Sequence, residues 1–229
     1  MHTSHHPFLL AGTSVHRVDF QPATLSDADL LWLPHHAQLA RAATKRKAEH
    51  LAGRLAAAHA LREYGISTVP GIGQNGAPQW PDGLAGSISH TSSCALAVVS
   101  QNALTGIDGE VILASEEAED IKDGIINADE EVLLRCCSLP FALALTLVFS
   151  AKESLFKALY PVAKTMMGFD SACVTALDEK HMTLALTRPL AGFDKGDTFS
   201  LPWLRDGAMV ITLLLSAPAA LPARQSPQR

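Results

Sequence analysis

The chain lacks several features that mark particular classes of protein. It has four cysteines in 229 residues, and none of them forms a CxxC pair or a zinc-type spacing, so we expect reduced thiols rather than disulfides or a structural zinc. It has no Lys/Arg-led signal peptide. The apolar run at 141–149 spans less than half of the roughly 20 residues that a membrane helix needs. We therefore expect a cytoplasmic protein, either free or as part of a peripheral membrane-associated complex.

Positive charge is also scarce. The formal net charge is −5 at pH 7, which argues against general nucleic-acid binding. What is abundant is apolar residues, 48% of the chain against 18% charged, a composition typical of a globular protein with a substantial core.

One long helix is predicted over residues 42–61, which are rich in alanine, leucine and long charged residues. Arg46 and Arg54 lie eight residues apart, about two turns, and so share a face. Basic residues near the positive end of the helix dipole are favourable only if they face an anion, although a solvated basic face is an equal alternative. Gly53 within this helix indicates close packing or the approach of a ligand. The histidines at 2, 5 and 6 are expected in a disordered tail.

The segment 149–160 carries the densest pattern. Ser150 and Glu153 have the spacing of a capping box, which predicts a helix start at Ser150, preceded by a buried helix over 141–149. Glu153 and Lys157 then lie one turn apart on the same face. They could cap and pair within the helix. They could also hold a metal and face a phosphate.

Two further segments supply partners for that second interpretation. On a strand, Asp108 and Glu110 project to the same face, where two carboxylates repel unless a cation lies between them; a solvent-facing acidic edge is the alternative. Ser89 and His90 are expected in a turn ahead of a buried strand at 94–99. Residues 71–76 match G-x-G-x-x-G, but the prolines around them indicate a turn-rich loop and not a dinucleotide site.

Several motifs occur in an order that resembles the Sfp-type 4′-phosphopantetheinyl transferases, in the branch of the enterobactin synthetase component D proteins. They are Lys45-Arg46-Lys47-x-Glu49-His50-Leu51-Ala52-Gly53-Arg54, Trp80-Pro81, Gly-Ser-Ile-Ser-His (86–90), Gly-Ile-Asp-x-Glu (106–110) and Phe-Ser-Ala-Lys-Glu-Ser-x-Phe-Lys (149–157). The similarity extends from about Leu30 to Leu215.

The resemblance implies an α+β fold of two similar subdomains related by a pseudo-twofold axis, with coenzyme A between them. We place the subdomains at 1–110 and 111–216, followed by a disordered tail at 217–229. The implied reaction is Mg²⁺-dependent transfer of phosphopantetheine from coenzyme A to a serine of apo aryl, peptidyl or acyl carrier domains. It releases adenosine 3′,5′-bisphosphate and serves siderophore synthesis by nonribosomal peptide synthetases. A monomer is the expected state.

The resemblance also assigns residues. Mg²⁺ would be held by Asp108, Glu110 and Glu153; coenzyme A would be bound by Arg46, Arg54, Ser89, His90, Asp108 and Lys157. We take Glu153 as the base and Lys157 as the group that steadies the leaving phosphate.

Two positions depart from the family. Gly109 separates the two carboxylates where relatives usually have a bulky residue, and a glycine there would loosen the strand and weaken metal binding. The loop before Trp80 lacks the basic residue that relatives often carry, so a phosphate contact would be absent or made by backbone amides.

Three other functions remain to be distinguished. A Mg²⁺-dependent phosphoesterase or another phosphotransferase could use the same carboxylates, but would not need Arg46 and Arg54. A non-catalytic module that binds coenzyme A or a carrier would not need the carboxylates and Lys157. A serine hydrolase built on Ser89, His90 and Asp108 lacks the G-x-S-x-G elbow.

Overall fold

The computed structural model describes residues 1–101 and 104–216, and the predicted disordered tail at 217–229 lies outside the described residues. The α-helices are α1 (Asp27–Leu30), α2 (Thr44–Arg62), α3 (Ser115–Ile121), α4 (Ala128–Cys136) and α5 (Phe141–Ala163). Short 3-10 turns occupy Pro22–Thr24, His36–Leu39, Gln74–Gly76, Lys122–Gly124 and Phe169–Ser171. The strands are β1 (Thr3–Leu10), β2 (Thr13–Phe20), β3 (Gly71–Ile72), β4 (Pro78–Gln79), β5 (Leu84–His90), β6 (Cys94–Gln101), β7 (Leu104–Val111), β8 (Ala172–Leu177), β9 (His181–Leu186), β10 (Thr198–Asp206) and β11 (Met209–Ser216).

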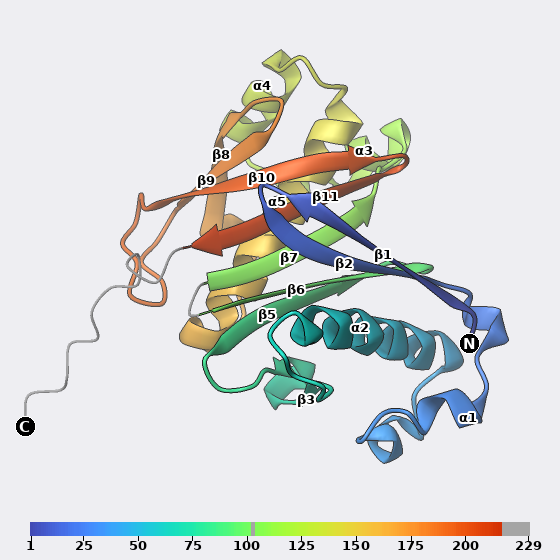
Figure 1. The fold of residues 1–229 in the computed structure, drawn as a ribbon. Coiled ribbons are helices and arrows are strands. Elements are labelled where there is room, and N and C mark those ends of the chain that lie inside the picture. Colours follow the sequence, from blue (N-terminus) through green and yellow to red (C-terminus); the bar gives the residue numbers. More distant parts are fainter. Residues whose placement is uncertain (102–103, 217–229) are drawn as a thin grey trace, which may run out of the picture.

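Two antiparallel sheets, each with one long helix, confirm the predicted α+β class. The first sheet has the order β1-β2-β6-β5, and the second has the order β7-β11-β10-β9-β8. Helix α2 lies against β2 and β6, and α5 lies against β7 and β11 (Figure 1). Strand β7 pairs with β11, so the segment that carries Asp108 and Glu110 belongs to the second sheet.

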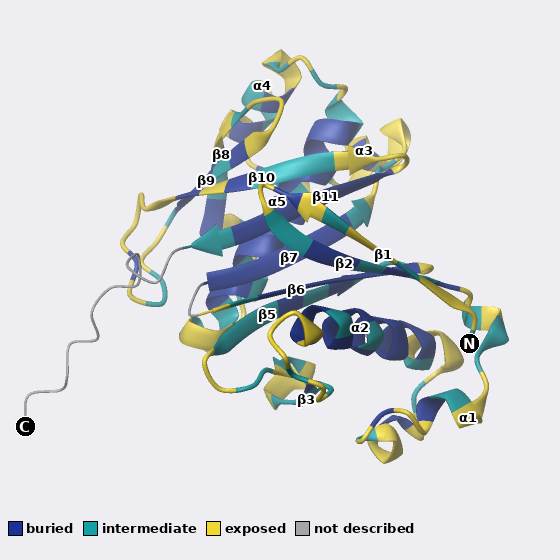
Figure 2. Cartoon of the chain, in the orientation of Figure 1, coloured by how far each residue is buried: buried dark blue, intermediate teal, exposed yellow. Residues whose placement is uncertain are grey.

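The core is divided among these layers. Alanines of α2 pack on Ala95 and Ala97 of the first sheet, and their small side chains let the helix lie close to the strands. Between the sheets, Leu96 and Val98 of β6 meet Ile107 of β7 and Ile211 of β11. Figure 2 shows the resulting buried residues along α2, β6 and β7. The two sheets are therefore held together by apolar packing, with one long helix on each outer side.

The prediction of a disordered N-terminus is wrong for residues 3–10. They form β1, which pairs in register with β2. His5 stacks on His59 of α2, with 3.7 Å between the ring centroids, and its Nε2 lies 3.0 Å from Nδ1 of His16. The histidines thus attach the first hairpin to α2.

In the described part of the chain no helix is long and apolar enough to cross a membrane.

Candidate functional site

Asp108 is the centre of the candidate site. The residue is 2% exposed, and its Oδ1 accepts hydrogen bonds from Ser89 Oγ (2.9 Å) and Lys157 Nζ (2.6 Å). The other oxygen, Oδ2, is buried without a hydrogen-bond partner in the described residues. A buried carboxylate oxygen is costly to leave unpaired, so this atom points to a ligand that supplies a positive charge or a donor.

Helix α5 brings Glu153 and Lys157 to this carboxylate. The predicted helix start at Ser150 is wrong, because α5 is continuous from Phe141 to Ala163. The Ser150 hydroxyl is buried inside the fold, 2.9 Å from Oγ1 of Thr212. The prediction that Glu153 and Lys157 share a helix face is confirmed, but the ammonium group of Lys157 bonds to Asp108 and to the Ile107 carbonyl (3.2 Å).

The electrostatics of the three carboxylates favour a bound cation. Burial raises the pKa of Glu110 to about 7, and the neighbouring charges of Asp108 and Glu153 add to the increase while Lys157 opposes it. Burial also raises the pKa of Glu153, with Lys157 opposing and Asp108 adding. Mutual repulsion of partly buried carboxylates is relieved by a cation between them.

These donors fit Mg²⁺ in kind. All are hard oxygen ligands, and Mg²⁺ in phosphoryl-transfer sites is held by one or two carboxylates together with waters and substrate phosphates. Among residues 1–101 and 104–216, no three His, Cys, Asp or Glu side chains are already close enough together to hold a metal ion. The carboxylates are thus gathered in one place without forming an all-protein cage.

The basic residues of α2 behave differently from each other. Arg46 Nη1 lies 3.0 Å from Nε2 of His90, at the mouth of the site. Arg54 is 4% exposed and donates to the carbonyls of Pro70 (2.8 Å) and Gly71 (3.0 Å). Its guanidinium therefore anchors the loop ahead of β3.

The sequence predicted a turn at Ser89 and His90. This prediction is wrong, because both residues lie at the end of β5. Besides donating to Asp108, Ser89 Oγ accepts from Gly109 N (3.2 Å). Burial lowers the pKa of His90, with Arg46 and Lys157 acting in the same direction and Glu49 and Asp108 opposing. The Ser89 hydroxyl is thus bonded to the carboxylate, an arrangement that lacks the serine–histidine pair of a hydrolase.

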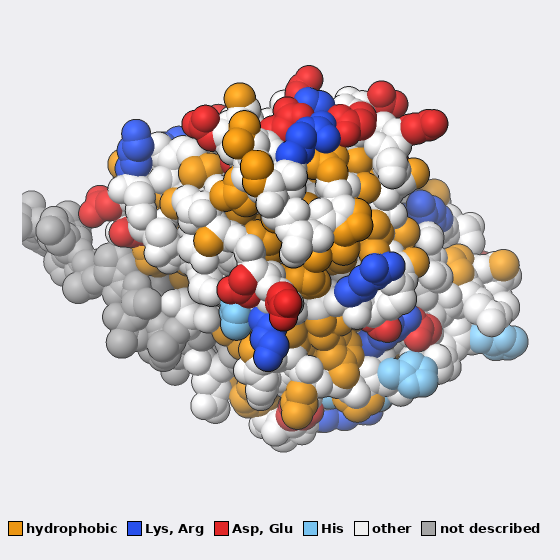
Figure 3. Space-filling model, turned by 90° about the horizontal axis from the view of Figure 1, so that it is seen from above, with side chains coloured by type: hydrophobic (Ala, Val, Ile, Leu, Met, Phe, Trp, Pro, Cys, Tyr) orange, Lys and Arg blue, Asp and Glu red, His pale blue; other side chains and the backbone are white. Residues whose placement is uncertain are grey.

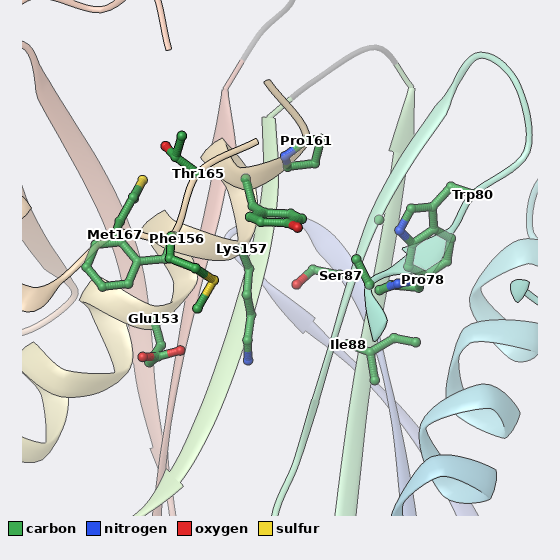
Figure 4. Close-up of a pocket in the computed structure, with 14 residues that line it drawn as sticks. Pro78, Trp80, Ser87, Ile88, Glu153, Phe156, Lys157, Pro161, Thr165 and Met167 are labelled. Carbon is green, nitrogen blue, oxygen red and sulfur yellow. The ribbon is translucent and has the colours of Figure 1, made fainter. Parts of the chain in front are cut away.

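A pocket of about 320 Å³ opens beside Glu153 and Lys157. Its walls come from α5 and the segment after it on one side and from β4, β5 and their connection on the other (Figure 4). Phe156 and Met167 face Pro78, Trp80 and Ile88 across the space. Sequence reasoning missed this pocket, although Phe156 and Tyr160 each follow a charged site residue, Glu153 and Lys157, by three residues along α5.

Close backbone approaches explain the glycines near the site. A Cβ on Gly106 would lie 1.8 Å from the Ser154 carbonyl oxygen, so α5 touches β7 there. A Cβ on Gly109 would lie 2.6 Å from Leu96 Cδ1, and one on Gly53 would lie 2.9 Å from Ile88 Cγ2. Gly109 therefore makes room for sheet-to-sheet packing, and β7 still pairs with β11 along its whole length. The Gly-rich segment at 71–76 opens no α-helix; it contains only a short 3-10 turn and forms part of the β3–β4 hairpin.

Comparison with known proteins connects this site to a family. Residues 35–100 match the model of the 4′-phosphopantetheinyl transferase N-terminal domain, and residues 105–206 match that of the 4′-phosphopantetheinyl transferase superfamily. The chain is 50% identical over 214 residues to enterobactin synthase component D of Salmonella typhi, covering 93% of this chain and 91% of that protein. It is 53% identical over 213 residues to the protein of the same name in Escherichia coli (strain K12), covering 93% and 98%. It is also 32% identical over 232 residues to the 4′-phosphopantetheinyl transferase Svp of Streptomyces mobaraensis, covering 95% and 92%.

Proposed function

The chain belongs to the 4′-phosphopantetheinyl transferase superfamily, and from this premise we propose that it transfers the 4′-phosphopantetheine group of coenzyme A to a serine of apo carrier domains in siderophore synthesis. The observation that carries the proposal for the site is the buried Asp108 carboxylate, which is bonded to Lys157 and has one oxygen with no hydrogen-bond partner among the residues that the structure describes. A cation and a diphosphate fit beside it, because the neighbouring carboxylates would bind the cation and Lys157 would bind the diphosphate.

We infer that Asp108, Glu110 and Glu153 hold Mg²⁺ together with the diphosphate of coenzyme A. Bound there, Mg²⁺ would neutralise the negative charge that develops on the phosphate oxygens. Lys157 would act on the same charge, since its ammonium group already lies at Asp108.

The carrier serine must lose a proton as it attacks. Its Oγ forms a bond to the phosphorus that carries pantetheine, the bond from that phosphorus to the bridging oxygen breaks, and adenosine 3′,5′-bisphosphate leaves. Glu153 is the proposed proton acceptor, because burial raises its pKa and a carboxylate with a raised pKa is the better base.

The rest of coenzyme A would occupy both sides of this centre. Arg46 and His90, at the mouth, would contact its phosphates, and Ser89 would keep Asp108 oriented. Arg54 would act near the adenosine end by holding the Pro70–Gly71 backbone. The largely apolar pocket beside Glu153 would take the pantetheine arm.

We propose aryl and peptidyl carrier domains of a siderophore synthetase as partners, with the chain acting as a monomer in the cytoplasm or on a peripheral synthetase complex. Eight of the 23 acidic residues lie in the segment 116–131, which could border a docking surface for the carrier or be a solvated helix. In the structure Glu131 pairs with Lys122 (2.8 Å) and Arg135 (2.8 Å). Figure 3, the view from above, shows acidic side chains beside basic ones both at one edge of this face and toward its middle, with hydrophobic side chains between them. Local pairing weakens the argument for an acidic docking patch.

The test of the function is the release of adenosine 3′,5′-bisphosphate with Mg²⁺, coenzyme A and apo carriers of the aryl, peptidyl and fatty-acid acyl classes. We expect one molecule released per carrier modified, none with a carrier whose acceptor serine is alanine, and the fastest release with siderophore carriers. Binding of coenzyme A without release from any carrier would favour the non-catalytic module.

Glu110→Gln is expected to raise the Tm of the metal-free protein, because the amide removes one of three mutually repelling carboxylates. The same change should reduce the increase in Tm that Mg²⁺ gives to the wild type, since a ligand that binds the folded state less tightly stabilises it less. Thermal unfolding in EDTA and in a Mg²⁺ series measures both effects, with the exposed Glu117→Gln as the matched control. A lower Tm in EDTA together with an unchanged increase in Tm on adding Mg²⁺ would show that Glu110 is not a metal ligand.

A further inference from the structure

A single side-chain hydrogen bond joins the β3–β4 hairpin to α5. Asn75 Nδ2 donates to the Tyr160 hydroxyl over 2.7 Å, linking residues 85 positions apart in the sequence. Within the described residues, no other hydrogen bond connects the loop at 73–77 with residues 153–167. We refer to this hydrogen bond as the Asn75–Tyr160 clasp.

The clasp connects opposite walls of the pocket. Ala77, the last residue of the loop, and Pro78, which follows it, line one wall, while Tyr160 and Pro161 line the other. Figure 4 shows Pro161 and Pro78 on opposite sides of the space, with Glu153 at the far end from Pro161. The clasp is thus at the end of the pocket away from the carboxylates.

The loop is built to present Asn75. The backbone of Asn75 has a φ of 54°, a left-handed conformation that asparagine tolerates better than most residues, and Gly76 follows with a φ of 79°. The Gly73 amide donates to the Ala77 carbonyl over 2.7 Å and closes the turn. Residues 74–76 are exposed, so little apolar burial would be lost if the loop moved away from α5.

The clasp lies where the thiol end of bound coenzyme A would be. This placement rests on the proposed function. The reacting phosphate would be bound beside Lys157 and Glu153, and the pantetheine arm would run along α5. Tyr160 is seven residues beyond Glu153, about 10 Å along the helix axis at 1.5 Å per residue. The thiol end of the arm, and any group attached to it, would therefore reach Tyr160, Met166 and the clasp.

We propose that the Asn75–Tyr160 clasp is a specificity determinant for the thiol end of the donor: while it is closed it favours free coenzyme A over coenzyme A thioesters with bulky acyl groups. The reaction at phosphorus is the same for both donors. The serine oxygen bonds to phosphorus, its proton passes to Glu153, the bisphosphate leaves, and the sulfur–acyl bond is untouched. The two donors differ only in the space that the group on the sulfur needs at the far end of the pantetheine arm.

The test compares kcat/KM for coenzyme A with that for acetyl, hexanoyl and benzoyl thioesters, using one apo carrier. Tyr160→Phe removes the hydroxyl and keeps the ring that lines the pocket. Asn75→Gly removes the partner amide and retains the left-handed backbone. Gln74→Ala is the matched control, because Gln74 is in the same exposed loop and its side chain takes part in none of the hydrogen bonds of the described residues.

We expect both variants to raise the ratio of kcat/KM for the bulky thioesters over that for coenzyme A by about three- to tenfold, the range that corresponds to losing one hydrogen bond. The double variant should show no more than the larger single effect, because both changes break the same bond. If both variants keep the wild-type ratio of kcat/KM values while the wild type transfers from coenzyme A, the proposed role of the clasp in donor specificity is wrong. Absence of transfer by the wild type would instead overturn the proposed function.

Discussion

Glu153→Gln is expected to lower kcat for carrier modification by about 10²- to 10⁴-fold, the usual contribution of a positioned general base. The amide cannot accept the serine proton, and it is a poorer ligand for a hard cation than a carboxylate. The fold should persist, since Glu153 is half-buried and forms none of the hydrogen bonds or ion pairs seen in the described residues. Steady-state kinetics with a saturating carrier and varied coenzyme A separate kcat from KM.

The exposed Glu117→Gln is the control for this change, because it also replaces one carboxylate by an amide but lies on α3. A Glu153→Gln enzyme that kept more than about a tenth of the wild-type kcat would rule out Glu153 as the base. A loss confined to the KM for coenzyme A would assign Glu153 to binding alone.

Gly106→Ala is expected to cause the largest loss of stability. The added Cβ would lie 1.8 Å from the Ser154 carbonyl oxygen and 3.0 Å from the Ala158 amide nitrogen, both backbone atoms of α5. Helix and strand must separate, and overpacking of this kind costs about 3 kcal/mol or more when backbone has to move. For a domain of this size that lowers Tm by roughly 6–12 °C.

The same displacement would act on catalysis, because α5 carries Glu153 and Lys157 while β7 carries Asp108. A shift of about 1 Å between reacting groups can reduce the rate by about a hundredfold. Thermal unfolding and the carrier assay below the Tm of the variant measure the two effects separately. Gly124→Ala is the control, since nothing lies within 4 Å of its added Cβ. Equal Tm values for the two variants would contradict the close packing of α5 on β7.

Local sequence patterns predicted the long elements well. Alanine and leucine over 42–61 indicated α2, and the alternation of Asp108 and Glu110 placed both on β7. The capping-box pattern at Ser150 failed because it uses only local spacing. In the fold the Ser150 hydroxyl is near Thr212, a residue 62 positions away, and the helix continues through it.

The first eight residues of the N-terminal hairpin show another limit of sequence reasoning. Residues 3–10 have no strong apolar alternation, so the polar histidines suggested a tail. Their order depends on β2 and on the stacking of His5 against His59 of α2, contacts between distant segments that no local pattern contains.

At the site, residue types could be identified from the sequence, but their connections could not. The motifs singled out Asp108, Glu153 and Lys157, and the structure brings the three together. The unpaired oxygen of Asp108 and the apolar pocket become visible only when distances are known. The role of Gly109 also depended on a distant partner, because Leu96 fills the space that a side chain there would need.

The most direct test of the central claim is the intact mass of a siderophore-synthetase carrier domain after incubation with coenzyme A, Mg²⁺ and this protein. We expect a gain of one phosphopantetheine group on the acceptor serine, with no gain when EDTA replaces Mg²⁺ and a strongly slowed gain with Glu153→Gln. An unchanged carrier mass with the wild-type protein and Mg²⁺, across aryl and peptidyl carriers alike, would contradict the claim that this site transfers phosphopantetheine.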